Sequence, residues 1–307
     1  MHYLGIDVGG TTIKAGLVDE AGKILQTGKA PTVADDLEGF LSKLTELIRG
    51  FQTSVPIDAI GIGVPGLHSS RTQIIETSPN IPCLNKTNLG DMVADQVHVR
   101  VTTENDANAG AYAEFVCGAG VGLQHVVYLS LGTGLGSGLI LNGGLFTGIS
   151  GYGGEFGHTV IDYRGRQCSC GNRGCLETLV SATGIVATAR EKMKAAPQGA
   201  LHASEEPLTS KSIYEAAIRG DQTAKEVFME TGRFLGIACA TLINLLNLEM
   251  IVLGGGVMAS GDLLMQQAKT VAAECAFPSS VRDCQIVQSK LWPEAGVIGA
   301  AMLARDR

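Results

Sequence analysis

The sequence predicts an α/β protein with two domains. The chain has 307 residues, and at roughly 100–200 residues per domain this length suggests two of them. Short apolar strands alternate with glycine turns and with amphipathic helical segments. A strand–glycine turn–strand unit occurs at 3–18 and, as a loose duplication, again at 125–141. These observations favour mixed sheets flanked by helices.

The first half of the chain begins with three short strands that are separated by glycine-containing turns, as in hairpins. Apolar residues then recur at i, i+3, i+4 and i+7 over 37–48, which predicts a helix. A second helix is expected over 107–115. Strands are expected at 3–8, 13–18, 24–29, 59–64 and 98–103.

The second half opens with strands at 125–131 and 138–141. Residues 180–247 are expected to be mainly helical, with 228–246 apolar on nearly all faces and therefore a buried helix. The stretch 195–210 is polar, contains two prolines and reads as a loop. A strand at 251–253 and a final helix at 295–304 complete the prediction.

Charge and composition exclude several classes of protein. The net charge is −7, and no basic cluster suggests a nucleic-acid surface. The longest apolar stretches fall short of about 18 residues, so no membrane span is predicted. Without a signal-peptide pattern, the expected location is the cytoplasm. The eight cysteines should stay reduced there, so clustered cysteines suggest a metal site or chemistry.

Glycine-rich turns at matching places suggest phosphate binding. The segment Asp7–Thr12 combines two glycines with two threonines, whose N–H and hydroxyl groups can wrap phosphate oxygens, and Asp7 can hold Mg²⁺. Leu131–Gly138 repeats the device, and Gly254–Gly256 would let an adenosine lie close to the backbone. Neither the dinucleotide fingerprint nor the P-loop spacing is present. An ordinary hairpin turn is the alternative for the first segment.

Asp106 ends a predicted strand and opens a predicted helix. A carboxylate there can orient a sugar hydroxyl and take its proton. The alternative is helix capping, which either Asn105 or Asp106 would perform well. The amides of Asn105 and Asn108 suit contacts with sugar hydroxyls because they both donate and accept.

A cluster of cysteines predicts a zinc site. Cys168, Cys170 and Cys175 lie within eight residues, and His158 precedes them by ten. Three cysteines and one histidine form a recognised structural zinc set, with no open coordination position. The second ring nitrogen of His158 would then be available to a ligand hydroxyl. Buried free thiols are the alternative.

Five segments together form a specific pattern: 7–11, 104–108, 131–138, 154–158 and the Cys-x-Cys-Gly-x-x-Gly-Cys-x-Glu run at 168–177. On these segments the chain resembles the ROK family of sugar kinases and repressors, which has the two-lobed actin-like ATPase (ribonuclease H-like) fold. The resemblance covers nearly the whole chain. Many relatives have Lys directly after the first Gly-Gly-Thr, whereas this chain has Thr12 there and Lys14 two residues on, a pattern that resembles the glucokinase-type members.

The resemblance implies a smaller lobe of 1–116 plus 294–307, a larger lobe of 117–293 with the zinc-binding loop, and a homodimer. It implies Asp106 as the catalytic base. ATP and Mg²⁺ would be bound by Asp7, Gly9, Gly10, Thr11, Thr12, Lys14, Gly132, Thr133, Gly134, Gly254, Gly255 and Gly256. The sugar-binding site would be lined by Gly66, Asn80, Asn105, Asp106, Glu155, His158 and Glu177. Structural Zn²⁺ would be bound by His158, Cys168, Cys170 and Cys175.

The leading hypothesis is therefore ATP-dependent phosphorylation of a hexose at its 6-hydroxyl, with glucose first and N-acetylmannosamine, fructose or allose as alternatives. A sugar-responsive repressor would need a DNA-binding domain before the first phosphate loop, and Asp7 comes too early for one. A glycoside hydrolase would pair Asp106 with Glu155 or Glu177, which leaves the phosphate-type loops without a role. A non-catalytic sugar-binding protein would not need Asp106.

Overall fold

The computed structural model describes residues 1–53, 55–195, 201 and 207–307. By their internal contacts these residues form two compact units. The first contains Met1–Tyr128, Gly138–Gly154 and Ser289–Arg307, and the second contains Leu129–Ser137 and Glu155–Gln288. The predicted lobes, 1–116 with 294–307 and 117–293, divide the chain at other residues and stay a prediction.

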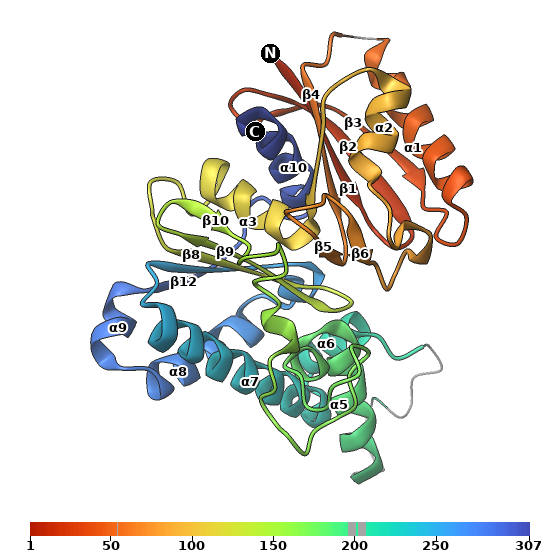
Figure 1. The fold of residues 1–307 in the computed structure, drawn as a ribbon. Coiled ribbons are helices and arrows are strands. Elements are labelled where there is room, and N and C mark those ends of the chain that lie inside the picture. Colours follow the sequence, from red (N-terminus) through yellow and green to blue (C-terminus); the bar gives the residue numbers. More distant parts are fainter. Residues whose placement is uncertain (54, 196–200, 202–206) are drawn as a thin grey trace. The chain divides into compact units, whose positions relative to one another are not determined.

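A five-stranded mixed sheet forms the centre of the first unit, in the order β3-β2-β1-β4-β7 (Figure 1). Strands β1, β2 and β3 pair antiparallel, whereas β4 and β7 continue the sheet in parallel from β1. The sheet strands are β1 (His2–Val8), β2 (Thr12–Asp19), β3 (Ile24–Pro31), β4 (Ala59–Val64) and β7 (Val101–Asn105). A separate two-stranded ribbon consists of β5 (Leu67–His68) and β6 (Ile75–Thr77), with a short 3-10 turn η1 at Pro82–Leu84.

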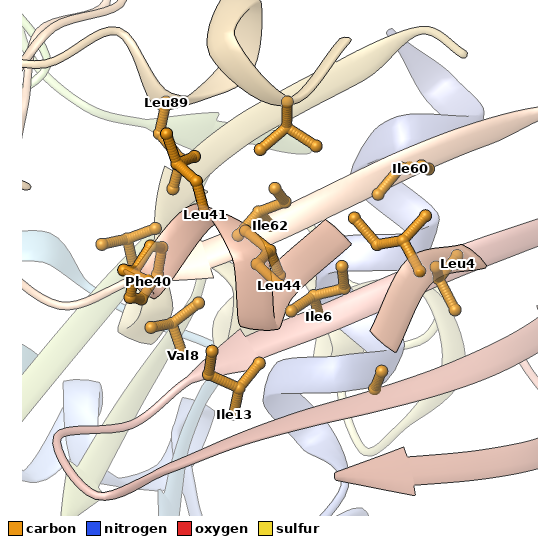
Figure 2. Close-up of a cluster of buried hydrophobic side chains, with 14 of the residues drawn as sticks. Leu4, Ile6, Val8, Ile13, Phe40, Leu41, Leu44, Ile60, Ile62 and Leu89 are labelled. Carbon is orange, nitrogen blue, oxygen red and sulfur yellow. The ribbon is translucent and has the colours of Figure 1, made fainter. Parts of the chain in front are cut away.

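Both faces of this sheet are covered by helices. Because side chains alternate along a strand, Leu4 and Ile6 point to one face, where they pack with Phe40 and Leu44 (Figure 2). Helices α1 (Leu37–Gln52) and α2 (Leu89–Val97) cover that face. Residues of the other face, such as Tyr3, pack against α3 (Asp106–Cys117) and α10 (Ala295–Asp306).

Helix α10 packs closely on the sheet because glycines face it. A Cβ on Gly5 of β1 would overlap the carbonyl oxygen of Val297, and one on Gly61 of β4 would overlap that of Ala300. Glycine within a strand commonly marks a close approach of another backbone. The helix therefore lies against the middle of the sheet, next to the strand ends that carry Asp7.

The predicted strand at 98–103 is wrong in its bounds, since the strand runs over Val101–Asn105. Helix α2 extends to Val97, and His98 ends it in a left-handed conformation with φ of 57°. The N–H of His98 donates to the carbonyl of Ala94 at 2.9 Å. The chain therefore cannot be extended at His98, and the strand begins three residues later.

A second five-stranded sheet has the order β10-β9-β8-β11-β12. Its strands are β8 (Val126–Leu131), β9 (Leu135–Leu141), β10 (Gly144–Phe146), β11 (Met250–Gly254) and β12 (Gln285–Gln288). Of these strands, β11 and β12 belong wholly to the second unit. That unit also contains α4 (Glu177–Val180), α5 (Ala182–Ala195), α6 (Ser210–Ile218), α7 (Gln222–Leu246), α8 (Asp262–Cys275), α9 (Pro278–Asp283) and the 3-10 turns η2 (Phe156–His158) and η4 (Gly256–Ser260). Helix α7 packs along α8.

The expectation of a buried helix over 228–246 holds for most of its residues but not for all of its faces. Helix α7 begins earlier, after Asp221, whose carboxylate accepts from the N–H of Ala224 at 2.8 Å. Met229 is 52% exposed and Leu245 is 74% exposed, so one side of the helix faces solvent. Most of the predicted loop at 195–210 lies outside the described residues. Within the described ranges, no helix combines the length and the apolar character needed to cross a membrane.

Candidate functional site

The segment that carries Asp106 lies at the carboxyl end of β7, where α3 begins. Asp106 is the first residue of α3, and Asn105 is its cap. Oδ1 of Asn105 accepts from the N–H of Ala107 at 2.9 Å and of Asn108 at 3.1 Å. Its Nδ2 donates to the carbonyl of Gly66 at 3.1 Å. Sequence reasoning left the capping role open between two residues. Asn105 is the N-cap, and Oδ1 of Asp106 also accepts from the N–H of Ala107 at 2.9 Å.

Two further residues predicted for the sugar site, Gly66 and Asn80, lie in the first unit. Gly66 has φ of +119°, and a Cβ there would overlap the carbonyl oxygen of Thr77, so only glycine fits. Asn80 lies beside the first glycine turn, since its Cβ is 3.5 Å from the place a Cβ would take on Gly10. Asn80, predicted for the sugar, and Gly10, predicted for the first phosphate loop, are therefore neighbours in this unit.

Asp7 stands opposite Lys14 in the antiparallel pairing of β1 with β2. Burial raises the pKa of Asp7 above its usual value, and the positive charge of Lys14 acts in the opposite direction. A Cβ on Gly296, at the start of α10, would come within 2.9 Å of the Asp7 carboxyl carbon. Lys14 thus has an electrostatic role next to Asp7, while its contact with a nucleotide stays a prediction.

In the second unit, two of the predicted nucleotide segments are in contact. The loop after β8 is closed by the N–H of Gly132, which donates to the carbonyl of Gly134 at 2.9 Å, and it is held by the N–H of Ala182, which donates to Gly132 at 2.8 Å. Gly255 has φ of +88°, and a Cβ there would overlap the carbonyl oxygen of Leu131. The glycine run 254–256 therefore lies directly against the loop 131–138.

The predicted zinc ligands His158, Cys168, Cys170 and Cys175 come together in the same unit. Their ligand atoms all lie within 4.8 Å of one another. Sγ of Cys168 is 3.7 Å from Nδ1 of His158, and Sγ of Cys170 is 3.7 Å from Sγ of Cys175. A tetrahedral Zn²⁺ with Zn–S bonds of about 2.3 Å would hold its sulfur ligands about 3.8 Å apart. The donor set therefore fits Zn²⁺.

The chemistry of the cluster agrees with its geometry. Burial and the neighbouring thiols Cys170 and Cys168 raise the pKa of Cys175 to about 12, so without a cation the Cys175 thiol keeps its proton. A bound cation reverses this, because coordinating thiols lose their protons. The turn that presents them needs glycine at 171 and 174, which have φ of +94° and +78°.

Glu155, His158 and Glu177 lie within electrostatic reach of one another. Burial within the surrounding protein raises the pKa of Glu155, even though part of its side chain is exposed; His158 lowers it and Glu177 raises it further. Oε2 of Glu177 accepts from the N–H of Leu135 at 2.9 Å, and its Oε1 is 3.8 Å from Sγ of Cys168. Glu177 thus links the cluster of His158 and the three cysteines to the loop 131–138.

Sequence reasoning missed Arg166, which binds the residue after Glu177 in α4 and residues of α5. Its guanidinium donates to the carbonyl of Thr178 at 2.6 Å and to the hydroxyl of Thr188 at 2.9 Å, and it pairs with Glu191 at 2.6 Å. These partners are 12 to 25 residues away in sequence. No local motif marks such an arginine, because its role depends on how α4 and α5 fold back on the zinc loop.

The model of the ROK family matches residues 3–307. The chain belongs to the ROK family. Among its relatives is a glucokinase from Thermotoga maritima, which is 35% identical over 100% of this chain and 98% of that protein. A xylose repressor from Caldicellulosiruptor bescii is 31% identical over 99% of this chain and 78% of that protein.

Solved structures confirm the predicted actin-like ATPase fold for this ROK protein. The crystal structure of a ROK family glucokinase from Streptomyces griseus in complex with glucose and AMPPNP has a TM-score of 0.87 and 34% identity, and each chain is covered in full. The α/β character and the mixed sheet flanked by helices agree with the sequence prediction.

Proposed function

We propose that this ROK protein is an ATP-dependent kinase that phosphorylates glucose at its 6-hydroxyl. Support comes from the glucokinase relatives, which match the chain over nearly its whole length. The neighbour that binds glucose and AMPPNP supports both substrates. N-acetylmannosamine, fructose and allose are the alternative acceptors.

The observation that carries the proposal is that Asn105 caps α3. Capping was the main alternative role for Asp106, and Asn105 occupies the N-cap position. One oxygen of Asp106, Oδ1, accepts from the N–H of Ala107 at 2.9 Å, so the proton transfer is assigned to the other oxygen. A carboxylate at the first turn of a helix, next to the Gly66 loop, is suited to accept a proton from a sugar hydroxyl. We therefore assign Asp106 as the general base.

In the proposed reaction, the oxygen of the 6-hydroxyl attacks the γ-phosphorus of ATP. The bond from that phosphorus to the β,γ-bridging oxygen breaks, ADP leaves, and the hydroxyl proton passes to the Asp106 carboxylate. Glu155, His158 and Glu177 would hold the other hydroxyls, because charged acceptors form strong hydrogen bonds with them. Catalysis of this kind depends mainly on positioning and on charge stabilisation.

Two metal ions belong to the proposal. Mg²⁺, when bound with ATP, neutralises phosphate charge, and Asp7 is the residue we expect to hold it, since Mg²⁺ prefers a few carboxylates with phosphate oxygens. Zn²⁺ would be held by His158 and the three cysteines in a structural role, because four protein ligands leave no open position.

The test of substrate is a coupled ADP-release assay. It would compare glucose with N-acetylmannosamine, fructose, allose and xylose at equal concentrations. We expect the highest kcat/KM with glucose. A higher kcat/KM with another sugar would show that this sugar, and not glucose, is the preferred substrate. If every sugar binds without ADP release, the protein is a regulator, like the repressors among its relatives.

The test of Asp106 is the Asp106→Asn variant. We expect it to bind glucose as wild type does and to lose about 10²–10⁴-fold in kcat, the usual contribution of general acid–base catalysis. Glucose affinity would be measured by calorimetry and turnover by ADP release. Asp95→Asn makes the same change at an exposed position of α2 and serves as the control. Near-normal turnover of Asp106→Asn would remove Asp106 from the mechanism.

A further inference from the structure

A buried carboxylate lies two residues before Asp106. Glu104, near the end of β7, has a side chain that is only 9% exposed. Its Oε1 accepts from the N–H of Asn105 at 3.0 Å and from Nδ2 of Asn108 at 3.1 Å. A buried charge needs such donors, because removing a carboxylate from water is costly. Glu104 thereby holds the residues on both sides of Asp106.

The other oxygen of Glu104 pairs with Arg307, which follows α10. Nη2 of Arg307 is 2.7 Å from Oε2 of Glu104, across 203 residues of sequence. The arginine side chain is 41% exposed. Breaking such a pair by removing one partner is usually far more costly than the pair is worth, because it leaves the buried charge uncompensated.

His68 of β5 lies on the same side of the unit. Its Nε2 is 2.7 Å from Oγ1 of Thr103, the residue before Glu104. Burial lowers the pKa of His68, although Glu104 raises it in part. At neutral pH His68 is therefore uncharged, and the positive charge beside Glu104 comes from Arg307. A polar cavity of about 320 Å³ is lined by His68, Glu104 and Arg307. There is therefore room for a substituted side chain at position 307.

We propose that Arg307 and Glu104 are positioning residues for the phosphoryl transfer. Arg307 fixes the Glu104 carboxylate, which fixes the backbone of Asn105 and the side chain of Asn108, and these two frame Asp106. The inference rests on the proposed function in that Asp106 is the base. It adds that a residue from the end of α10 sets the orientation of the base.

The test compares Arg307→Gln with Arg305→Gln. Arg305 lies at the same end of α10, but it donates to the carbonyl of Glu20 and pairs with Asp306 instead of Glu104. We expect Arg307→Gln to lower kcat by up to about 100-fold, since small misplacements of reacting groups have effects of that size. The KM for the sugar should change much less. Arg305→Gln should keep wild-type kcat.

Arg307→Lys is the conservative variant and should recover part of the lost kcat, because an ammonium keeps the charge without the planar fork of the guanidinium. If Arg307→Gln does not fold, Arg307→Lys is compared with Arg305→Gln in its place. A double-mutant cycle with Glu104→Gln should show coupling in kcat, whereas independent sites add. Additive effects would contradict the proposed chain of contacts.

Amide hydrogen exchange tests the same contacts without relying on activity. The N–H of Asn105 should exchange faster in Arg307→Gln than in wild type and in Arg305→Gln, because its acceptor loses its anchor. If Arg307→Gln matches Arg305→Gln in both kcat and exchange, the inference is wrong while the kinase proposal stands. If exchange responds but Asp106→Asn keeps its turnover, the network exists but Asp106 is not the base, and the positioning role falls with it.

Discussion

At the scale of single residues, the same motif holds groups with different tasks. The run Glu104-Asn105-Asp106-Ala107-Asn108 can be found in the sequence as one pattern. In the structure Asn105 caps α3 and Glu104 is a buried anchor, which leaves Asp106 as the candidate base. Neither distinction can be made from the order of residues, because it depends on which way each side chain leaves the end of β7.

The buried His68 gives a prediction about pH. Its folded-state pKa lies below the usual 6.5, so below about pH 6.5 the unfolded chain binds a proton that the folded chain does not. The free energy of unfolding should therefore fall as the pH drops from 6.5 towards the folded-state pKa. In His68→Gln, which can keep a hydrogen bond to Thr103, this loss should be smaller.

The measurement is urea unfolding of both proteins at pH 7.5 and pH 5.5. The quantity of interest is the difference between the two proteins in the change with pH, because other groups titrate in both alike. An equal loss of stability on acidification in wild type and His68→Gln would show that His68 does not contribute.

At the scale of elements, helices and strands follow from local patterns, but their fit depends on glycines that no local pattern explains. The strands β1 and β4 are predictable from their apolar residues. The requirement for Gly5 and Gly61 within them is not, because it arises from the carbonyl groups of α10, over 230 residues away in sequence. Small residues on both surfaces let the helix and the sheet approach closely.

We predict that Gly61→Ala lowers the free energy of unfolding by about 1–3 kcal/mol or more, since the added Cβ would overlap the carbonyl oxygen of Ala300 in a packed core. Gly50→Ala is the matched control. Gly50 lies in α1 with nothing within 4 Å of an added Cβ, so it should be neutral or stabilising by up to about 1 kcal/mol. Chemical denaturation measures both, and an unchanged stability of Gly61→Ala would contradict the close packing of α10.

At the scale of the whole molecule, the chain folds as two compact units with separate roles in the proposal. The first unit carries Asp7 and Asp106, and the second carries the zinc cluster with Glu155 and Glu177. Chain order alone does not give this division, since 138–154 and 289–307 return to the first unit. Removing the metal should therefore act first on the second unit.

We predict one zinc per chain in wild type and a loss of zinc in Cys170→Ser. Cys170 is exposed, so without a metal its replacement would have little effect on packing. The midpoint of thermal unfolding should fall by about 2–4 °C for each kcal/mol of metal-binding free energy that is lost. Amides in 155–180 should lose protection against hydrogen exchange before those of β1 and β4 do. Metal analysis and hydrogen exchange measure this.

Cys275→Ser removes another exposed thiol, which lies in α8 away from the cluster, and should leave zinc content and stability unchanged. Full stability of Cys170→Ser, or zinc well below one per chain in fresh wild-type protein, would contradict the metal assignment.

By itself, the sequence determined the ROK family pattern, the α/β class, most strands and helices and the four residues of the Cys/His cluster, because each rests on residues that are close in sequence or on spacing with a physical period. Only the tertiary structure decided that Asn105 is the cap, that Glu177 contacts the loop 131–138, and that Arg307 meets Glu104. Those contacts join residues 42 to 203 positions apart or depend on side-chain direction. They are fixed by the packing of α10, the sheet and the zinc loop, which local sequence does not record.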